Sequence, residues 1–271
     1  MGEGQGEGDI LVGEERLPWQ DRDKYVTNSL PGGSKLLPTA WKKMIKAIIF
    51  DLGGVLMTDV PLKQIAEELS KESPLSEQEI HTHLYPTEHW TLLTLGKITE
   101  DEYWDHFLHA LTQAEGKINA DKKYLKDKVR SSLYPLKHST RIVNLLKNHS
   151  FDYAQDLRYK LGILSNHAKE WSEYMKQSFD LFKSFDQIIF SCDIGLRKPD
   201  PKSYQIALER LQSDPNECVF IDDKKRNTDA AEKLGIKGIV FEESSKLVEE
   251  LARLGIKIES KEGSDAQLSG E

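Results

Sequence analysis

Residues 48–56 read Ile-Ile-Phe-Asp-Leu-Gly-Gly-Val-Leu, an apolar run that stops at an acid and continues into a pair of glycines. The run 45–50 has the length and composition of a buried β-strand, and the glycines bound it with a turn. Packing alone gives no reason for an acid at the end of such a strand. Asp51 is therefore the first candidate for a functional side chain.

Four more short apolar runs follow, and they alternate with segments of helical periodicity. This alternation is typical of parallel strands joined by crossover helices, so the sequence predicts an α/β fold. The further strands are expected at 160–164, 187–191, 218–221 and 238–241, and the helices at 139–148, 169–182, 201–211, 228–234 and 245–254.

Residues 61–133 have a different pattern, with several helical segments and no good strand. Two capping boxes mark helix starts in this stretch, Ser76 with Glu79 and Thr99 with Glu102. In each pair the hydroxyl and the acid satisfy free backbone amides reciprocally. We therefore expect a helical domain inserted after the first strand.

The two ends of the chain differ in composition from the middle. Residues 1–43 and 259–271 are rich in glycine and polar residues, which cannot bury enough apolar area to order themselves, and we expect flexible tails there. The core domain is then expected at 44–60 and 134–258. The stretch 148–159 is longer than a helix-to-strand connection needs, and the sequence assigns it no function.

The charge balance argues against a nucleic-acid partner. Lysine and arginine number 37 against 45 acids, so the formal net charge is −8 and the chain has little attraction for a phosphate backbone. The two cysteines, Cys192 and Cys218, lack the spacing of a zinc site, and such sparse use fits a reducing compartment. No stretch is suited to a signal peptide or a membrane span, so we expect a cytoplasmic protein without a membrane partner.

Polar residues stand at four places where predicted strands end or the next helix begins. Because ligands bind at the carboxyl ends of parallel strands, these side chains can converge on one site. Each has an ordinary explanation on its own, as a turn, cap or surface residue. The ordered set, however, indicates a single functional site. It comprises Asp51, Ser165 with Asn166, Lys198, and the pair Asp222-Asp223.

In this order the four motifs resemble those of the haloacid dehalogenase superfamily, over residues 45–254. The resemblance implies a doubly wound, Rossmann-like α/β core with a mobile cap. The insert at 61–133 is similar to the helical cap of the superfamily's first subfamily. The Asp-Leu-Gly start at 51–53 and the Gly-Leu-Arg-Lys-Pro segment at 195–199 resemble some of its sugar-phosphate phosphatase branches.

The resemblance also implies roles for the matching residues. A carboxylate that attacks phosphorus faces charge repulsion, which a bound cation neutralises. Mg²⁺ prefers the hard oxygen ligands that acids provide. By resemblance, Asp51 is the nucleophile and a Mg²⁺ ligand, Asp223 the main second ligand with Asp222 assisting, Gly53 a ligand through its carbonyl, Ser165 and Lys198 the phosphoryl-binding residues, and Asn166 an orienting residue.

Gly53 departs from the usual pattern of the superfamily, in which a second acid two residues after the nucleophile protonates the leaving group. Glycine keeps the carbonyl for the metal but supplies no proton, and general acid–base help is worth about 10²–10⁴-fold. His167 is a candidate replacement because histidine titrates near neutrality. Its position also fits an ordinary surface or cap-facing histidine at a helix start.

We therefore expect a Mg²⁺-dependent phosphomonoester hydrolase that acts on a small phosphorylated metabolite, such as a sugar phosphate, through an aspartyl phosphate on Asp51. Two alternatives stay open, a 2-haloacid dehalogenase-type hydrolase and a non-catalytic binding or regulatory protein of the same fold. The paired acids Asp222 and Asp223 argue against the dehalogenase, because an anionic pair beside an anionic substrate is costly without a cation.

The insert carries an aromatic and basic set that could close on a polar substrate. Lys97 is the candidate for substrate contact, although lysines in such loops are usually solvated. Helical spacing with Phe107, Leu108 and Leu111 indicates that Trp104 belongs to the core of the insert. The full set is Tyr85, His89, Trp90, Lys97, Tyr103 and Trp104.

Overall fold

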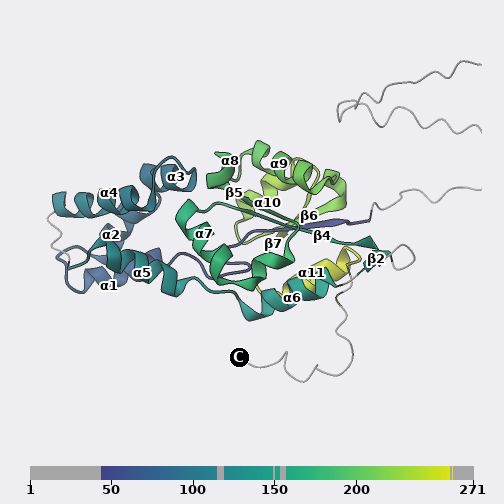
Figure 1. Ribbon diagram of the computed structural model, residues 1–271, viewed down its shortest axis with the longest axis horizontal. Coiled ribbons are helices and arrows are strands. Elements are labelled where there is room, and N and C mark those ends of the chain that lie inside the picture. Colours follow the sequence, from purple (N-terminus) through teal and green to yellow (C-terminus); the bar gives the residue numbers. More distant parts are fainter. Residues whose placement is uncertain (1–43, 115–118, 149, 153–156, 257, 259–271) are drawn as a thin grey trace, which may run out of the picture. The chain divides into compact units, whose positions relative to one another are not determined.

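The computed structural model describes residues 44–114, 119–148, 150–152, 157–256 and 258 (Figure 1). The tails predicted at 1–43 and 259–271 lie outside these residues. Within the described ranges, no helix has both the length and the apolar character needed to cross a membrane. The cytoplasmic location stays a prediction.

Five parallel strands form the central sheet. They are β1 (Ala47–Phe50), β4 (Lys160–Ser165), β5 (Gln187–Phe190), β6 (Cys218–Asp222) and β7 (Lys237–Val240). Their order across the sheet is β5-β4-β1-β6-β7. All five predicted strands are confirmed to within two residues at either end. The order makes β1 the central strand, with β4 and β6 as its neighbours.

Alternation along β1 builds a separate core on each face of the sheet, because successive side chains point in opposite directions. Ile48 and Phe50 pack in one core, whereas Ala47 and Ile49 pack in the other. Helices cover both faces, as a doubly wound fold requires (Figure 1). The first face carries α6 (Lys137–Lys147), α7 (Lys169–Ser178) and α11 (Ser244–Arg253), and the second carries α9 (Pro201–Leu211) and α10 (Lys225–Glu232).

The core differs from the sequence prediction in several places. The helix predicted at 169–182 ends at Ser178, with a 3-10 helix following at Asp180–Ser184, and the helix predicted at 228–234 begins at Lys225. Part of the stretch 148–159 forms a small antiparallel pair, β2 (Ser150–Asp152) and β3 (Leu157–Arg158), which the sequence did not indicate. The strand predicted to reach residue 191 ends one residue earlier, and the short helix α8 (Ser191–Ile194) begins there.

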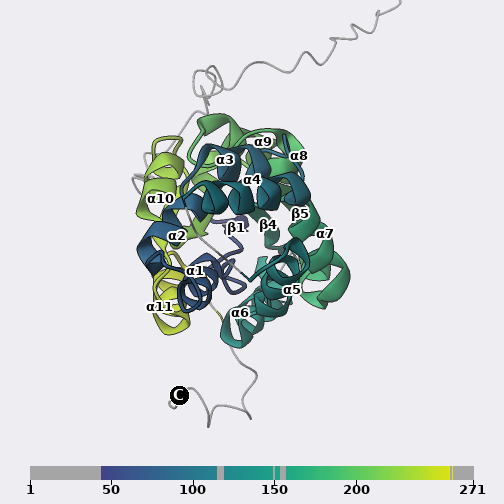
Figure 2. The same cartoon turned by 90° about the vertical axis from the view of Figure 1, so that its left-hand side faces the viewer.

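All the described elements of the insert are helices, which confirms the helical cap. Both predicted capping boxes are present, at Ser76 with Glu79 and at Thr99 with Glu102. Figure 2 shows these helices gathered in front of one end of the sheet. The exact domain boundaries stay a prediction. The helices are α1 (Leu62–Ser70), α2 (Glu77–Leu84), α3 (Glu88–Thr94), α4 (Glu100–Gln113) and α5 (Lys122–Ser132).

A buried cluster around Glu100 joins the insert to the core domain. Arg130 of α5 donates to both carboxylate oxygens of Glu100, at 2.9 and 2.6 Å. The indoles of Trp104 and Trp171 donate to the same carboxylate at 3.2 and 2.8 Å, and Trp171 lies on α7. Burial raises the pKa of Glu100, but these hydrogen bonds outweigh it and hold the pKa below its ordinary value. The cluster confirms Trp104 as a core residue.

Candidate active site

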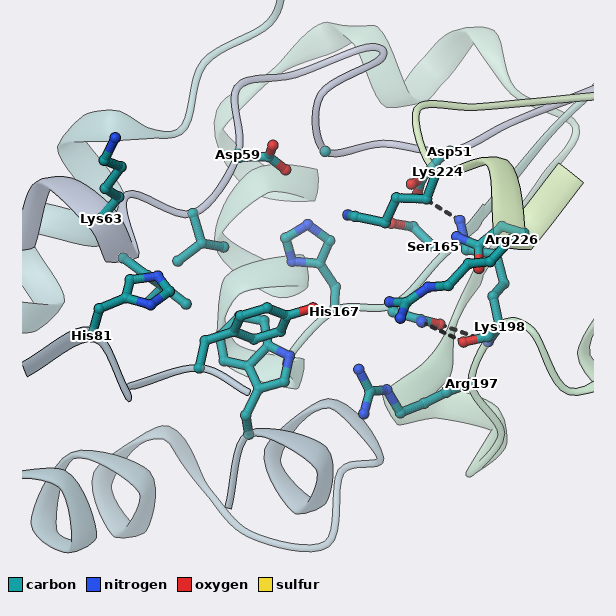
Figure 3. Close-up of a pocket in the computed structure, with 17 residues that line it drawn as sticks. Asp51, Asp59, Lys63, His81, Ser165, His167, Arg197, Lys198, Lys224 and Arg226 are labelled. Carbon is teal, nitrogen blue, oxygen red and sulfur yellow. Dashed lines mark hydrogen bonds and ion pairs between the residues drawn. The ribbon is translucent and has the colours of Figure 1, made fainter. Parts of the chain in front are cut away.

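The carboxyl ends of the three central strands bring the predicted motifs together (Figure 3). Phe50 lies level with Ile163 of β4 and Ile221 of β6, so the residues that follow share one edge of the sheet. Asp51 comes directly after β1, and Asp222 ends β6. A pocket of about 330 Å³ opens there, with Asp51, Gly53, Ser165, Asn166 and Lys198 among its lining residues.

Lys198 lies between two buried carboxylates. Its Nζ is 2.8 Å from Asp51 Oδ1 and 2.6 Å from Asp222 Oδ2, and its side chain is 1% exposed. Burial raises the pKa of Asp51, but the charge of Lys198 and hydrogen bonds from Lys198, Ser165 and the Leu52 amide together hold it below its ordinary value. Asp51 is therefore ionised at neutral pH, which is the form that a nucleophile needs.

Asn166 positions the backbone of this lysine. Its Nδ2 donates to the Lys198 carbonyl at 3.0 Å, and its Oδ1 accepts from the Lys198 amide at 2.9 Å. Because Asn166 directly follows β4, this reciprocal pair ties the loop that carries Lys198 to the central sheet. Asn166 can therefore contribute the orienting role predicted from the sequence by positioning Lys198.

Asp51, Asp222 and Asp223 form a cluster in which one carboxylate oxygen of each lies within 4.8 Å of the others. Burial raises the pKa of Asp223, and the nearby charge of Asp51 adds to this. Its Oδ1 is buried and has no hydrogen-bond partner among the residues that the structure describes. A buried, unpartnered carboxylate oxygen in an acidic cluster is a suitable ligand for a hard cation, so the residues fit the predicted Mg²⁺.

Asp222 is held in place by a residue that the sequence did not single out. Asn227 Nδ2 donates to both oxygens of Asp222, at 2.9 and 3.0 Å, and the Lys224 amide donates at 2.8 Å. Burial raises the pKa of Asp222, and the charge of Lys198 offsets part of that rise. The signal available in the sequence was an amide four residues after Asp223, which falls in the first turn of α10.

The space beside Gly53 is bordered by a second unpredicted residue, Asp59. A Cβ added at Gly53 would lie 2.6 Å from Asp59 Oδ1 and 4.0 Å from His167 Nε2. Asp59 is exposed at the pocket wall, on the loop that leaves β1. Partial loss of water raises its pKa, Lys224 lowers it and Asp51 raises it further, with a net increase. The signal available in the sequence was that Asp59 is an acid six residues after Gly53, the position where the superfamily usually carries its general acid.

His167 also lines the pocket, but it is buried rather than on the surface. Burial lowers the pKa of His167 to about 4, with smaller effects from neighbouring charges. The imidazole is therefore neutral at neutral pH and does not carry the extra proton that a replacement acid would donate. Its backbone amide donates to Ser191 Oγ, which in turn donates to the Thr94 carbonyl of the insert.

Only part of the aromatic and basic set reaches the pocket. Tyr85 and Trp90 line it, with ring centroids 5.4 Å apart. Lys97 is exposed and is not among the lining residues, whereas Arg197 is, and its Nη1 donates to Thr91 Oγ1 at 2.9 Å. The remaining members, His89, Tyr103 and Trp104, pack against other rings within the insert.

Fold and site together define a class, that of doubly wound α/β proteins with a helical insert and a cluster of acids at the carboxyl edge of the sheet. Comparison with known families gives the same result, because the pattern of the haloacid dehalogenase-like hydrolases matches residues 48–241. The chain belongs to this family.

Named relatives indicate the type of hydrolase. The chain is 27% identical over 200 residues to the phosphorylated carbohydrates phosphatase of Thermotoga maritima, covering 72% of this chain and 84% of that protein. It is also 27% identical over 169 residues to flavin mononucleotide hydrolase 1 of Arabidopsis thaliana, covering 62% of this chain and 63% of that one. The protein is thus a hydrolase of the phosphatase type.

A solved structure shares the fold. An enzyme of this family from Bacteroides thetaiotaomicron, in complex with magnesium and inorganic phosphate, superposes with a TM-score of 0.57. The two chains are 21% identical, and the match covers 75% of this chain and 98% of the other. At this sequence identity the similarity establishes the fold alone, and the reaction has to be inferred from the site residues.

Proposed function

We propose that the protein hydrolyses a small phosphomonoester with the help of Mg²⁺, and that the phosphoryl group passes through Asp51. One observation carries the proposal: the Asp51 carboxylate is held ionised by Lys198 within 4.8 Å of two further acids. A nucleophile, its cationic neighbour and a cation-binding cluster therefore occupy one edge of the sheet. These are the groups that attack on a phosphate ester requires.

Each residue has a distinct task in the proposed reaction. Asp51 attacks phosphorus, forming an acyl phosphate as the bond to the leaving oxygen breaks, and water then hydrolyses the acyl phosphate. Ser165 and Lys198 donate to the phosphoryl oxygens where negative charge develops. Mg²⁺, held by Asp51, the Gly53 carbonyl, Asp222 and Asp223, would neutralise the attacking carboxylate and the phosphate when bound.

The pocket supports a small substrate. Its volume of about 330 Å³ is at the lower end of the roughly 300–1,000 Å³ that ligand pockets span. The lining combines the rings of Tyr85 and Trp90 with the guanidinium of Arg197, which suits a polar, phosphorylated metabolite of sugar size. The name of the Thermotoga maritima relative supports the same substrate class.

A direct test is hydrolysis of p-nitrophenyl phosphate with Mg²⁺ and with a chelator. We expect turnover that the chelator removes and added Mg²⁺ restores, because the acidic cluster repels an anionic substrate until a cation binds. Turnover that is insensitive to the chelator would contradict the proposal. Release of halide from a 2-haloacid without metal would instead favour the dehalogenase reaction.

Mg²⁺ is also expected to stabilise the fold, and to do so more at about pH 8 than at about pH 5. Burial raises the pKa of Asp222, one of the proposed ligands, to about 6, so the folded protein holds this proton at a higher pH than the unfolded chain does. Its contribution to stability therefore falls as pH rises from the ordinary value through the raised one. Mg²⁺ competes with that proton, so its effect grows over the same window.

Thermal unfolding with and without Mg²⁺ measures this effect. An ion present at a hundred times its Kd raises the free energy of unfolding by about 2.7 kcal/mol. Asp223→Asn should lose most of the rise in Tm, whereas Asp229→Asn, a change on α10 that does not line the pocket, should keep it. If Mg²⁺ raised the Tm equally in the two variants, or equally at the two pH values, the assigned site would be wrong.

A further inference from the structure

The space beside position 53 is occupied by the end of the Asp59 side chain. Gly53 is not among the glycines with positive φ, so its conformation is open to other residues. A Cβ there would meet Asp59 Oδ1 at 2.6 Å, whereas the next contacts, Asp59 Cγ and His167 Nε2, are at ordinary distances of 3.8 and 4.0 Å. The Asp59 carboxylate therefore fills the space into which a side chain at 53 would project.

From this geometry we propose that Asp59 is the proton donor to the leaving group, in place of the absent acid at Gly53. The inference rests on the phosphatase function proposed above. Both residues line the pocket that contains Asp51, so a carboxyl group in this space faces a substrate bound there (Figure 3). Within the described part of the chain, no hydrogen bond or ion pair ties the Asp59 carboxylate elsewhere. The group is available to a ligand.

The Asp59 carboxylate could instead be a metal ligand. Asp59 and Asp223 flank Gly54, each with an Oδ2 3.3 Å from the position of a Cβ built on it. However, the group of acids whose oxygens converge within 4.8 Å consists of Asp51, Asp222 and Asp223, and Asp59 is not a member. Its carboxylate lies outside this group and beside Gly53, the position at which the superfamily usually carries the acid that protonates the leaving group.

In the proposed reaction, the Asp59 proton moves to the leaving oxygen and is replaced by a proton from water. Asp51 forms a bond to phosphorus, the bond between phosphorus and the ester oxygen breaks, and Asp59 gives its proton to that oxygen to release the alcohol. The Asp59 carboxylate then takes a proton from water as the water oxygen attacks phosphorus. The bond between Asp51 and phosphorus breaks, releasing inorganic phosphate and restoring both acids.

The leaving group provides the test. Phenyl phosphate and p-nitrophenyl phosphate have similar shapes, but nitrophenolate departs with little protonation and phenolate does not. We expect Asp59→Ala to lower kcat/KM for phenyl phosphate by about 10²–10⁴-fold and to change the nitrophenyl ester much less. Equal losses on both esters, no loss on either, or a higher Mg²⁺ requirement in the variant would overturn the role of Asp59.

A compensating variant separates chemistry from structure. Asp59→Ala opens the space beside position 53, so Gly53→Asp combined with Asp59→Ala should recover most of the lost activity on phenyl phosphate. Failure of the folded double variant to recover it would overturn the proposal. Asp229→Ala, a change at a half-buried position on α10 that does not line the pocket, serves as the control and should leave both esters unaffected.

The same assay distinguishes the two proposals in this protein. A native protein that hydrolyses both esters with Mg²⁺, unaltered by Asp59→Ala, would overturn the proton donor and leave the phosphatase intact. A native protein that hydrolyses neither ester would overturn the phosphatase and the proton donor with it.

Discussion

Asp51→Asn is expected to reduce hydrolysis of p-nitrophenyl phosphate by a factor on the order of 10⁶, the scale of loss when a catalytic nucleophile is removed. Asparagine has the shape of aspartate and can still accept the hydrogen bond that the Leu52 amide makes to Oδ1. Its uncharged amide is a poor nucleophile toward phosphorus. Steady-state kinetics with saturating Mg²⁺ measure the loss.

The same substitution should leave the fold intact. Asp51 contributes to the raised pKa values of Asp59, Asp222 and Asp223, so removing its charge relieves repulsion among these acids. Lys198 keeps Asp222 as its partner at 2.6 Å. This relief opposes the loss of the ion pair between Asp51 and Lys198, so we expect a folded variant with a Tm close to that of the native protein, and lost activity cannot then be ascribed to unfolding. Asp229→Asn is the activity control, and turnover in Asp51→Asn close to that of the control would contradict the assignment.

Lys198→Met is expected to lower the free energy of unfolding by about 3–5 kcal/mol, in addition to removing activity. Methionine approximates the length of the side chain but leaves two buried carboxylates without their shared cation, which lies 2.8 Å from Asp51 and 2.6 Å from Asp222. For a domain of this size, such a loss corresponds to a fall in Tm of roughly 10 °C. Thermal unfolding in the presence of a chelator isolates this effect from metal binding.

A second variant and a change of pH test the cause. Asp222→Asn added to Lys198→Met removes one of the unpaired carboxylates and should recover part of the stability without recovering activity. Burial already raises the pKa of Asp222, and without Lys198 the pKa rises further. The carboxyl is then protonated at low pH, so the loss in Lys198→Met should be larger at about pH 8 than at about pH 5. An unchanged Tm at neutral pH would contradict the proposed arrangement.

Elements with a strong local signal were predictable from the sequence. The five apolar runs form the five strands of the sheet, because short runs of β-branched and aromatic residues pack well in a buried β-sheet. The capping boxes at Ser76 and Thr99 were correct because a cap depends only on residues three positions apart. For the same reason Asp51 and Asp222, both adjacent to strand ends, could be placed at one edge of the sheet.

Features that depend on the path of a loop were not predictable. Asp59 meets the space beside Gly53 only because the chain after β1 turns back on itself, as in the hydrogen bond from the Gly54 amide to the Met57 carbonyl. Lys97 was expected to contact substrate, but its loop lies outside the pocket, and Arg197 reaches the pocket instead. The short pair β2 and β3 was missed because strands of three and two residues carry little periodic signal.

Transfer of the phosphoryl group to Asp51 is the step on which the proposed function depends. Rapid acid quenching during turnover of p-nitrophenyl phosphate with Mg²⁺, followed by peptide mass spectrometry, detects this intermediate. We expect the peptide containing Asp51 to gain the mass of one phosphoryl group during turnover, and Asp51→Asn to show no such gain. A phosphoryl group found on another residue, or an unmodified Asp51 peptide throughout pre-steady-state turnover in an enzyme that shows a burst of nitrophenol, would contradict transfer to Asp51.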